Sequence, residues 1–117
     1  MVSSANNFGR DIGSISNQQE VKTMFNNQRY ITRGINAEIL LWLQIFMWEC
    51  IDKLPKECDY FQVFKLKNLD GIQRITHFSE QPEYRMEYLI PTDNPITSKV
   101  YIIDSDTYST MLLSNEY

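Results

Sequence analysis

The stretch EILLWLQIFMWECI, from Glu38 to Ile51, constrains the fold of this chain more than any other segment. It is typical of a helix, yet Gln44 is the one polar residue between Ile39 and Trp48. A surface helix keeps a polar stripe along one side. A bilayer-spanning helix needs roughly 20 apolar residues, and this run has about ten. We therefore expect no membrane span, and the apolar side chains must enter a core or meet a partner.

The helix is predicted to begin after the N-cap residue Asn36 and to end near Leu54, before Pro55. At about 100° per residue, one side forms a complete core face. That face consists of Leu40, Leu43, Met47, Cys50, Ile51 and Leu54.

Trp42 and Ile45 fall on the opposite side, within about 40° of Glu38. Glu49 and Asp52 lie on the same side. Either another part of the chain covers the two apolar residues, or they form a partner-binding patch with a charged rim. The sequence leaves both alternatives open.

The rest of the chain is predicted to form strands joined by short turns. Segments rich in aromatic and β-branched residues alternate with turn signals such as Asp70-Gly71. The last segment could instead be a helix capped by Ser105 or Asp106, but we favour a strand. The predicted strands are 29–34, 59–67, 72–80, 84–90, 99–104 and 107–113. The expected fold is α+β, with the order β-α-β-β-β-β-β: an antiparallel sheet of about five to six strands with one long apolar helix on one face.

Residues 1–28, rich in Asn, Gln and Ser, are expected to form a flexible polar leader, and residues 29–117 are expected to form a single α+β domain. Met24 could be an alternative start, so residues 1–23 could be an upstream extension. The net charge is −4, and the leader contributes two cations and two acids to it. The acidic balance therefore belongs to residues 29–117, which argues against broad nucleic-acid binding and permits a basic protein partner.

No motif requires an enzyme, a cofactor or a metal. His77 could act with Ser79, Glu80 or Glu83, but a structural strand histidine is the simpler interpretation. Asp104-Ser105-Asp106 is typical of a hairpin turn rather than a calcium loop.

Two further groups have simple structural interpretations. Cys50 and Cys58 are expected to be reduced, although a disulfide stays open. Lys65, Lys67 and Arg74 could form a small basic patch beside Phe61, which we interpret as a solvated face.

Several motifs together resemble domain-of-unknown-function family 960, small proteins of Gram-positive bacteria and their mobile elements. They are RYITRG, LQ.FMWE.ID.L, DY.QVF.L and I.H..E.PEY, in this order. Proline and glutamate are common in that family where this chain has Leu40 and Trp42. The resemblance implies a cytoplasmic accessory protein with no catalytic residues to transfer. Some similar small proteins resemble anti-CRISPR inhibitors of type II RNA-guided nucleases.

We therefore expect a small acidic, non-enzymatic binding protein that inhibits a bacterial defence nuclease, plausibly a CRISPR effector or its RNA complex. The expected contact residues are Trp42, Ile45, Glu38, Glu49 and Asp52. Sequence-specific nucleic-acid binding is not expected. The alternative is a homo-oligomeric structural or regulatory protein of a mobile element, such as a homodimer, with no nuclease target.

Overall fold

The structure is a computed structural model, and it describes residues 23–117. Six strands form one sheet, with two helices and a terminal 3₁₀ turn. In chain order the elements are β1 (Gln28–Ile31), α1 (Arg33–Glu38), α2 (Leu41–Asp52), β2 (Phe61–Asn68), β3 (Ile72–Glu80), β4 (Glu83–Pro91), β5 (Ser98–Asp104), β6 (Tyr108–Leu113) and η1 (Ser114–Glu116). The predicted α+β class with a mostly antiparallel sheet is confirmed, and the last segment is a strand rather than a helix.

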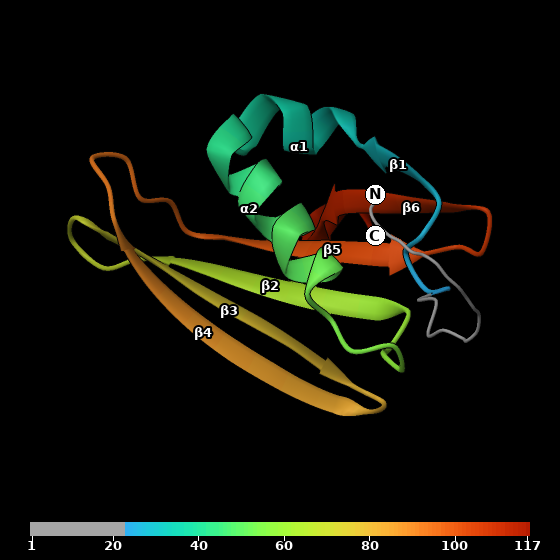
Figure 1. The fold of residues 1–117 in the computed structure, drawn as a ribbon. Coiled ribbons are helices and arrows are strands. Elements are labelled where there is room, and N and C mark those ends of the chain that lie inside the picture. Colours follow the sequence, from blue (N-terminus) through green and yellow to red (C-terminus); the bar gives the residue numbers. More distant parts are fainter. Residues whose placement is uncertain (1–22) are drawn as a thin grey trace, which may run out of the picture.

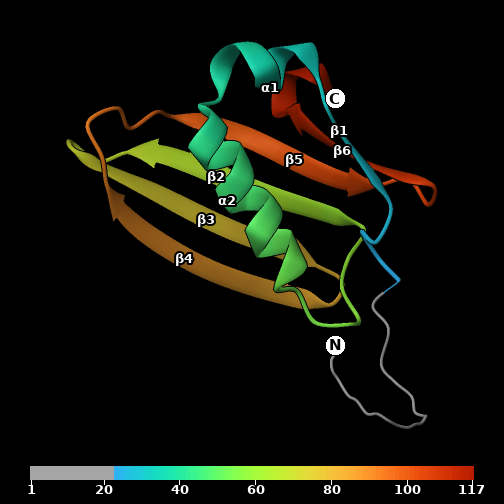
Figure 2. The same ribbon diagram turned by 45° about the horizontal axis from the view of Figure 1, so that its top comes forward.

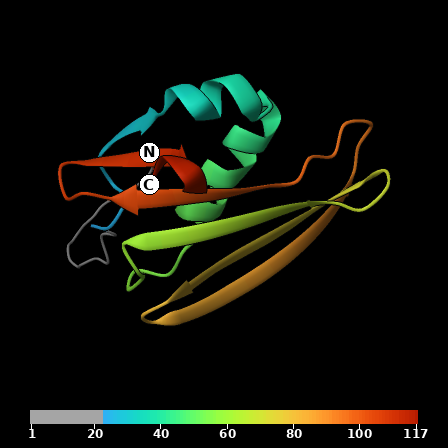
Figure 3. The ribbon, with the colours of Figure 1, turned by 180° about the vertical axis from the view of Figure 1, so that it is seen from behind.

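Both α-helices lie on one side of the sheet, and α2 crosses it diagonally (Figures 1 and 2). The same two layers are visible from behind (Figure 3). We call the other side of the sheet the open face, because neither α-helix covers it. The strand order is β1-β6-β5-β2-β3-β4, and β1 runs parallel to β6 while all other pairs are antiparallel.

The prediction of one long helix was wrong, because the chain leaves the helical conformation at Ile39 and Leu40. Their ψ angles are 122° and 145°, which separates α1 from α2. Thr32, rather than Asn36, caps α1 by accepting a hydrogen bond from the Ile35 N–H at 3.2 Å. The Gln44 side chain donates to the Ile39 carbonyl at 2.8 Å and so satisfies a backbone group exposed by the break.

Packing gives the break a physical reason. The α1 helix packs on β6 near one edge of the sheet, whereas α2 reaches β4 at the other edge through the Phe46–Tyr88 ring contact at 5.0 Å. Two helices at an angle bury both Ile35 and Met47 completely. The predicted core residue Leu40 falls in the break and is 40% exposed, while the other five predicted core residues are buried.

The sheet is not a simple succession of neighbouring hairpins, since β5 pairs with β2 and not with β4. This position places Val100 and Ile102 of β5 in the centre of the core, where both are fully buried. The crossing loop is held by the Gln73 side chain, which donates to the Ile96 carbonyl at 2.9 Å and accepts from the Ile96 N–H at 2.8 Å.

The predicted Asp-Gly turn joins β2 to β3. Asp70 and Gly71 both have positive φ, 53° and 88°, as a two-residue hairpin turn of this kind requires. The hairpin fixes which side chains of β2 face the helices: Gln62, Phe64 and Leu66 are buried there, whereas Lys65 and Lys67 lie on the open face.

Residues 1–22, most of the proposed leader, lie outside the described residues. The short segment before β1 packs on the domain through Phe25, which is 1% exposed. Asp104 at the end of β5 accepts hydrogen bonds from the Phe25 N–H at 2.7 Å and the Asn27 side chain at 3.0 Å. The Asp-Ser-Asp segment is therefore a hairpin turn that also anchors the N-terminal segment.

Candidate functional site

The outer side of α2 carries an exposed apolar stripe. Leu41 is 69% exposed and Ile45, one turn later, is 50% exposed. Glu49 and Asp52 continue the same side of the helix and are also exposed. We call these four residues the α2 stripe. No described part of the chain buries its apolar end.

The other two predicted contact residues lie apart from this stripe. Trp42 is half-buried and packs against the core. Glu38 is exposed but is the last residue of α1, so the break at Ile39 and Leu40 separates it from α2. The sequence analysis did not include Leu41, although helical periodicity places it on this side, about 20° from Asp52 and about 40° from Ile45.

The charged end of the stripe is fixed by β1. Arg29 forms an ion pair with Asp52 at 2.5 Å, and its guanidinium lies 4.7 Å from the centre of the Trp48 ring. Both partners are partly exposed, so the pair positions these side chains more than it stabilises the fold. A partner at the stripe would therefore meet Asp52 together with its counter-ion Arg29.

His77, the one histidine of the chain, lies on the helix side of β3 and is fully buried. Its ring stacks on Phe64 with centroids 4.1 Å apart, and Nε2 lies 2.7 Å from the Gln62 side-chain oxygen. Burial lowers the pKa of His77 to about 4, so the ring is neutral at physiological pH. Glu80 and Glu83 are exposed at the β3–β4 turn, so the structure does not unite them with His77 in an accessible site.

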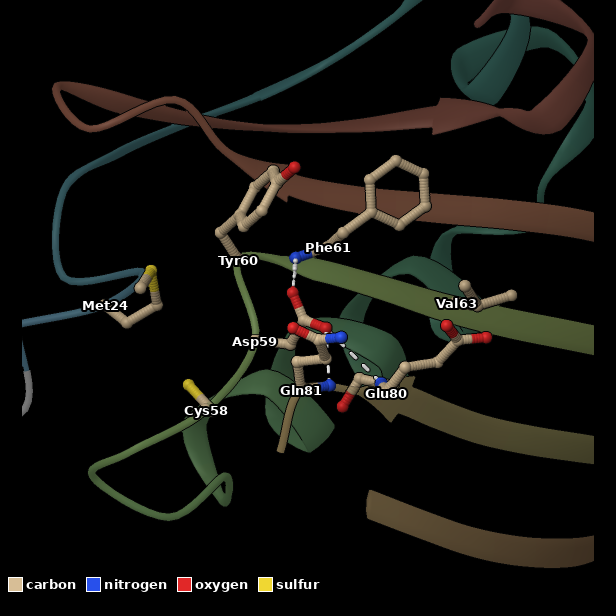
Figure 4. Close-up of a pocket in the computed structure, with 9 residues that line it drawn as sticks. Met24, Cys58, Asp59, Tyr60, Phe61, Val63, Glu80 and Gln81 are labelled. Atoms are coloured by element: carbon tan, nitrogen blue, oxygen red, sulfur yellow. Dashed lines mark hydrogen bonds between the residues drawn. The ribbon is translucent and has the colours of Figure 1, made fainter. Parts of the chain in front are cut away.

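A pocket of about 560 Å³ opens where β2 begins and β3 ends (Figure 4). Asp59 lies in its wall, but its carboxylate accepts hydrogen bonds from the N–H groups of Phe61, Glu80 and Gln81 at 3.0, 3.3 and 2.9 Å. Through these bonds the carboxylate links the start of β2 to the end of β3, so its oxygens already have hydrogen-bond partners. The remaining lining is Met24, Cys58, Tyr60, Val63 and Ser79, which includes no imidazole to activate a nucleophile.

The buried Cys50 and the half-buried Tyr88 form a polar contact between α2 and β4. Burial raises the pKa of the Cys50 thiol, and burial together with Cys50 raises the pKa of Tyr88 to about 12. Both groups therefore stay protonated at neutral pH, the opposite of an activated thiolate.

Residues 23–117 contain no group of three or more His, Cys, Asp and Glu side chains that could hold a metal ion. No helix in this part of the chain is long and apolar enough to cross a membrane.

Comparison with known proteins places the chain in a family. Its sequence matches the family model "Staphylococcal protein of unknown function (DUF960)" over residues 28–116. No curated protein matches it. A similar solved structure is a crystal structure of a protein of unknown function from Enterococcus faecalis, with 20% identity and a TM-score of 0.64. The match covers 83% of this chain and 96% of the other, and at this identity it shows a shared fold alone. By the family match, which spans every strand and helix described above, this chain belongs to the DUF960 family.

Proposed function

We propose that this protein is a non-enzymatic, cytoplasmic binding protein that contacts a protein partner through the α2 stripe. The observation that carries this proposal is the exposure of Leu41 and Ile45 on a helix whose other apolar residues are well packed. Complete burial of a large aliphatic side chain supplies about 1.5–3 kcal/mol, and Leu41 and Ile45, which are 69% and 50% exposed, would each gain roughly half of this in an interface. That is enough to make them the centre of a modest interface.

The charges beside the stripe indicate which kind of partner surface would fit it. Glu49 and Asp52 follow the apolar residues, and the chain as a whole carries a net charge of −4. A complementary surface has an apolar pocket for Leu41 and Ile45 next to basic side chains. Charge complementarity would mainly accelerate association, and the apolar contact would hold the complex.

The narrower form of the proposal names a defence nuclease as the partner, specifically a type II RNA-guided CRISPR nuclease. Such nucleases hold nucleic acid in a positively charged channel, which an acidic protein could enter. The acidic balance of residues 29–117 and the family resemblance support this choice. In this form, the protein inhibits by occupying a surface that the nuclease needs.

A cleavage assay tests the narrower form. Purified protein is added to several type II nucleases loaded with guide RNA, and cleavage of target DNA is measured. We expect inhibition that Leu41→Glu and Ile45→Glu each weaken by tenfold or more, corresponding to about 1.4 kcal/mol. Leu69→Glu is the matched control, because Leu69 is an exposed leucine in the β2–β3 turn, away from α2. No inhibition by excess protein would remove the nuclease hypothesis.

The stripe also suits an alternative, self-association into a homo-oligomer. Light scattering on the wild type and on Ile45→Glu separates the two hypotheses. A wild-type dimer that becomes a folded monomer favours the self-interface, whereas a monomer in both cases excludes it. Ile45 is a better site for this test than Trp42, since Trp42 also packs against the core.

A further inference from the structure

The open face contains a basic groove that is independent of the α2 stripe. The groove has a volume of about 410 Å³, and five cationic side chains line it together with Thr76, Thr97 and Ser98. They come from four different strands: Lys65, Lys67, Arg74, Arg85 and Lys99. Three of these residues, Lys65, Lys67 and Arg74, are predicted from the sequence to form a solvated face, whereas the structure places them in a groove.

Strand pairing explains why the cations converge. Lys65 of β2 is the register partner of Lys99 of β5, and Lys67 is the partner of Arg74 of β3. Side chains opposite each other on adjacent strands lie about 5 Å apart at Cβ and share a face. Like charges in such positions repel each other, so this arrangement costs stability unless an anion binds there.

The charge of the groove contrasts with that of the whole chain. Removing these five positive charges from the net charge of −4 leaves −9 for the rest of the chain. No carboxylate lines the groove itself; Glu87, beside it, pairs with Arg74 at 2.7 Å. The protein therefore has a local anion-attracting field within an acidic molecule.

Aromatic rings accompany the cations on the same face. The charged groups of Lys65 and Arg85 lie over the Phe78 ring, 5.6 and 6.0 Å from its centre, and that of Lys99 lies over the Tyr101 ring at 5.8 Å. Phe78 and Tyr101 both pair with Val63, on opposite sides of β2, so their backbones lie about 10 Å apart. Both residues are only partly buried, and the Tyr101 ring also contacts the rings of Phe61 and Tyr117, at 4.8 and 5.6 Å.

We propose that this open face binds single-stranded nucleic acid without sequence preference. Phosphates would contact the groove cations, and bases would stack on Phe78 and Tyr101, the combination that single-strand binding surfaces use. An acidic peptide could neutralise the cations, but it has no regular supply of planar groups for the two rings. A duplex would be a poor ligand, because its bases are paired and stacked and cannot stack on the two rings.

Fluorescence anisotropy with labelled oligo-dT and oligo-U of about 12 nucleotides tests the proposal. We expect binding at low salt that weakens steeply between about 50 and 200 mM salt, with a log–log slope of about −3 from four to five phosphate contacts. Comparing the affinities for the two oligonucleotides shows whether the protein prefers DNA or RNA. Duplex DNA of the same length should bind more weakly.

Two variants of the open face and one control separate the contributions of charge and of stacking to binding. Lys65→Ala/Lys99→Ala should weaken binding about tenfold or more at low salt and reduce the slope by about 1–2. Phe78→Leu should weaken binding about tenfold and leave the slope unchanged, because it removes stacking and not charge. Lys53→Ala/Lys56→Ala is the matched control, since both lysines are exposed near the end of α2, outside the groove, and it should bind like the wild type. Circular dichroism and the thermal midpoint confirm that each variant is folded.

Three outcomes would overturn the proposal. These are no binding of either oligonucleotide at low salt, an equal loss in the Lys53/Lys56 control, and a folded groove variant that binds like the wild type. Polyglutamate that competes as well as oligo-dT would assign the groove to acidic peptides instead. The α2 stripe variants should bind oligo-dT normally, so failure here leaves the proposed protein-binding function intact.

Discussion

Acidification should destabilise the fold through His77, whose ring is buried as the neutral base. The folded pKa is about 4 and the ordinary value is 6.5. Because the unfolded chain binds a proton at higher pH than the folded protein does, stability is lost as pH falls from 6.5 towards 4. The full pKa difference corresponds to roughly 3 kcal/mol, and about 2 kcal/mol of this should be lost between pH 7.5 and pH 5.

Urea unfolding at these two pH values measures the effect, with His77→Gln as the reference. Glutamine does not titrate and still offers Gln62 a hydrogen-bonding group, so the variant should lose about 2 kcal/mol less over the same interval. Because the chain has one histidine, its NMR signals also report the folded pKa directly. Equal losses in wild type and variant, or a folded pKa near 6.5, would refute a buried neutral ring.

Three other predictions concern the anchors of the fold. Asp104→Ala should lower the free energy of unfolding by about 2–4 kcal/mol, because it leaves the Phe25 N–H without its acceptor. The control Asp93→Ala, in an exposed loop, should change the free energy of unfolding little. Similar losses in the two variants would contradict the anchoring role of Asp104. Hydrogen bonds from Thr32, Leu113 and Gly34 lower the pKa of Glu116. The contribution of the Glu116 carboxylate to stability is therefore present at pH values above the ordinary pKa of 4.5, and it is lost as the pH falls through the folded pKa. Glu116→Gln should be less stable than wild type at pH 7 and equally stable in strong acid. Thiol labelling of the native protein should modify Cys58 well before Cys50, because Cys50 is buried and its pKa is raised by burial. Equal labelling rates for the two thiols would show that α2 opens readily.

Local signals predicted much of the fold. The Asp-Gly turn placed the β2–β3 hairpin, and that turn together with the Gln-Pro-Glu break at 81–83 gave the bounds of β3. Helical periodicity identified buried residues of α2 such as Leu43 and Met47, and it placed Ile45 on the outer side. These signals depend on residues close in sequence, so they can be recognised without knowledge of the tertiary structure.

Features that depend on distant pairing were not predictable. The helix break has no Gly or Pro to mark it, because it arises from two packing directions over the sheet. The position of β5 depends on Gln73 holding Ile96, a contact between residues 23 positions apart. For the same reason Lys99 and Arg85 could not be assigned to the groove, since their neighbouring strands were unknown.

The parallel pairing of β1 with β6 has a consequence for how the chain reaches its native state. The N-terminal strand finds its partner only when the last strand is present, and the contacts that join Phe25 to Asp104 and Thr32 to Glu116 span 79 and 84 positions. During synthesis, the first strand and α1 must therefore wait until β6 and Glu116 have left the ribosome. Closing such long loops slows folding. Loss of the last few residues should release the beginning of the chain, although the two ends are far apart in sequence.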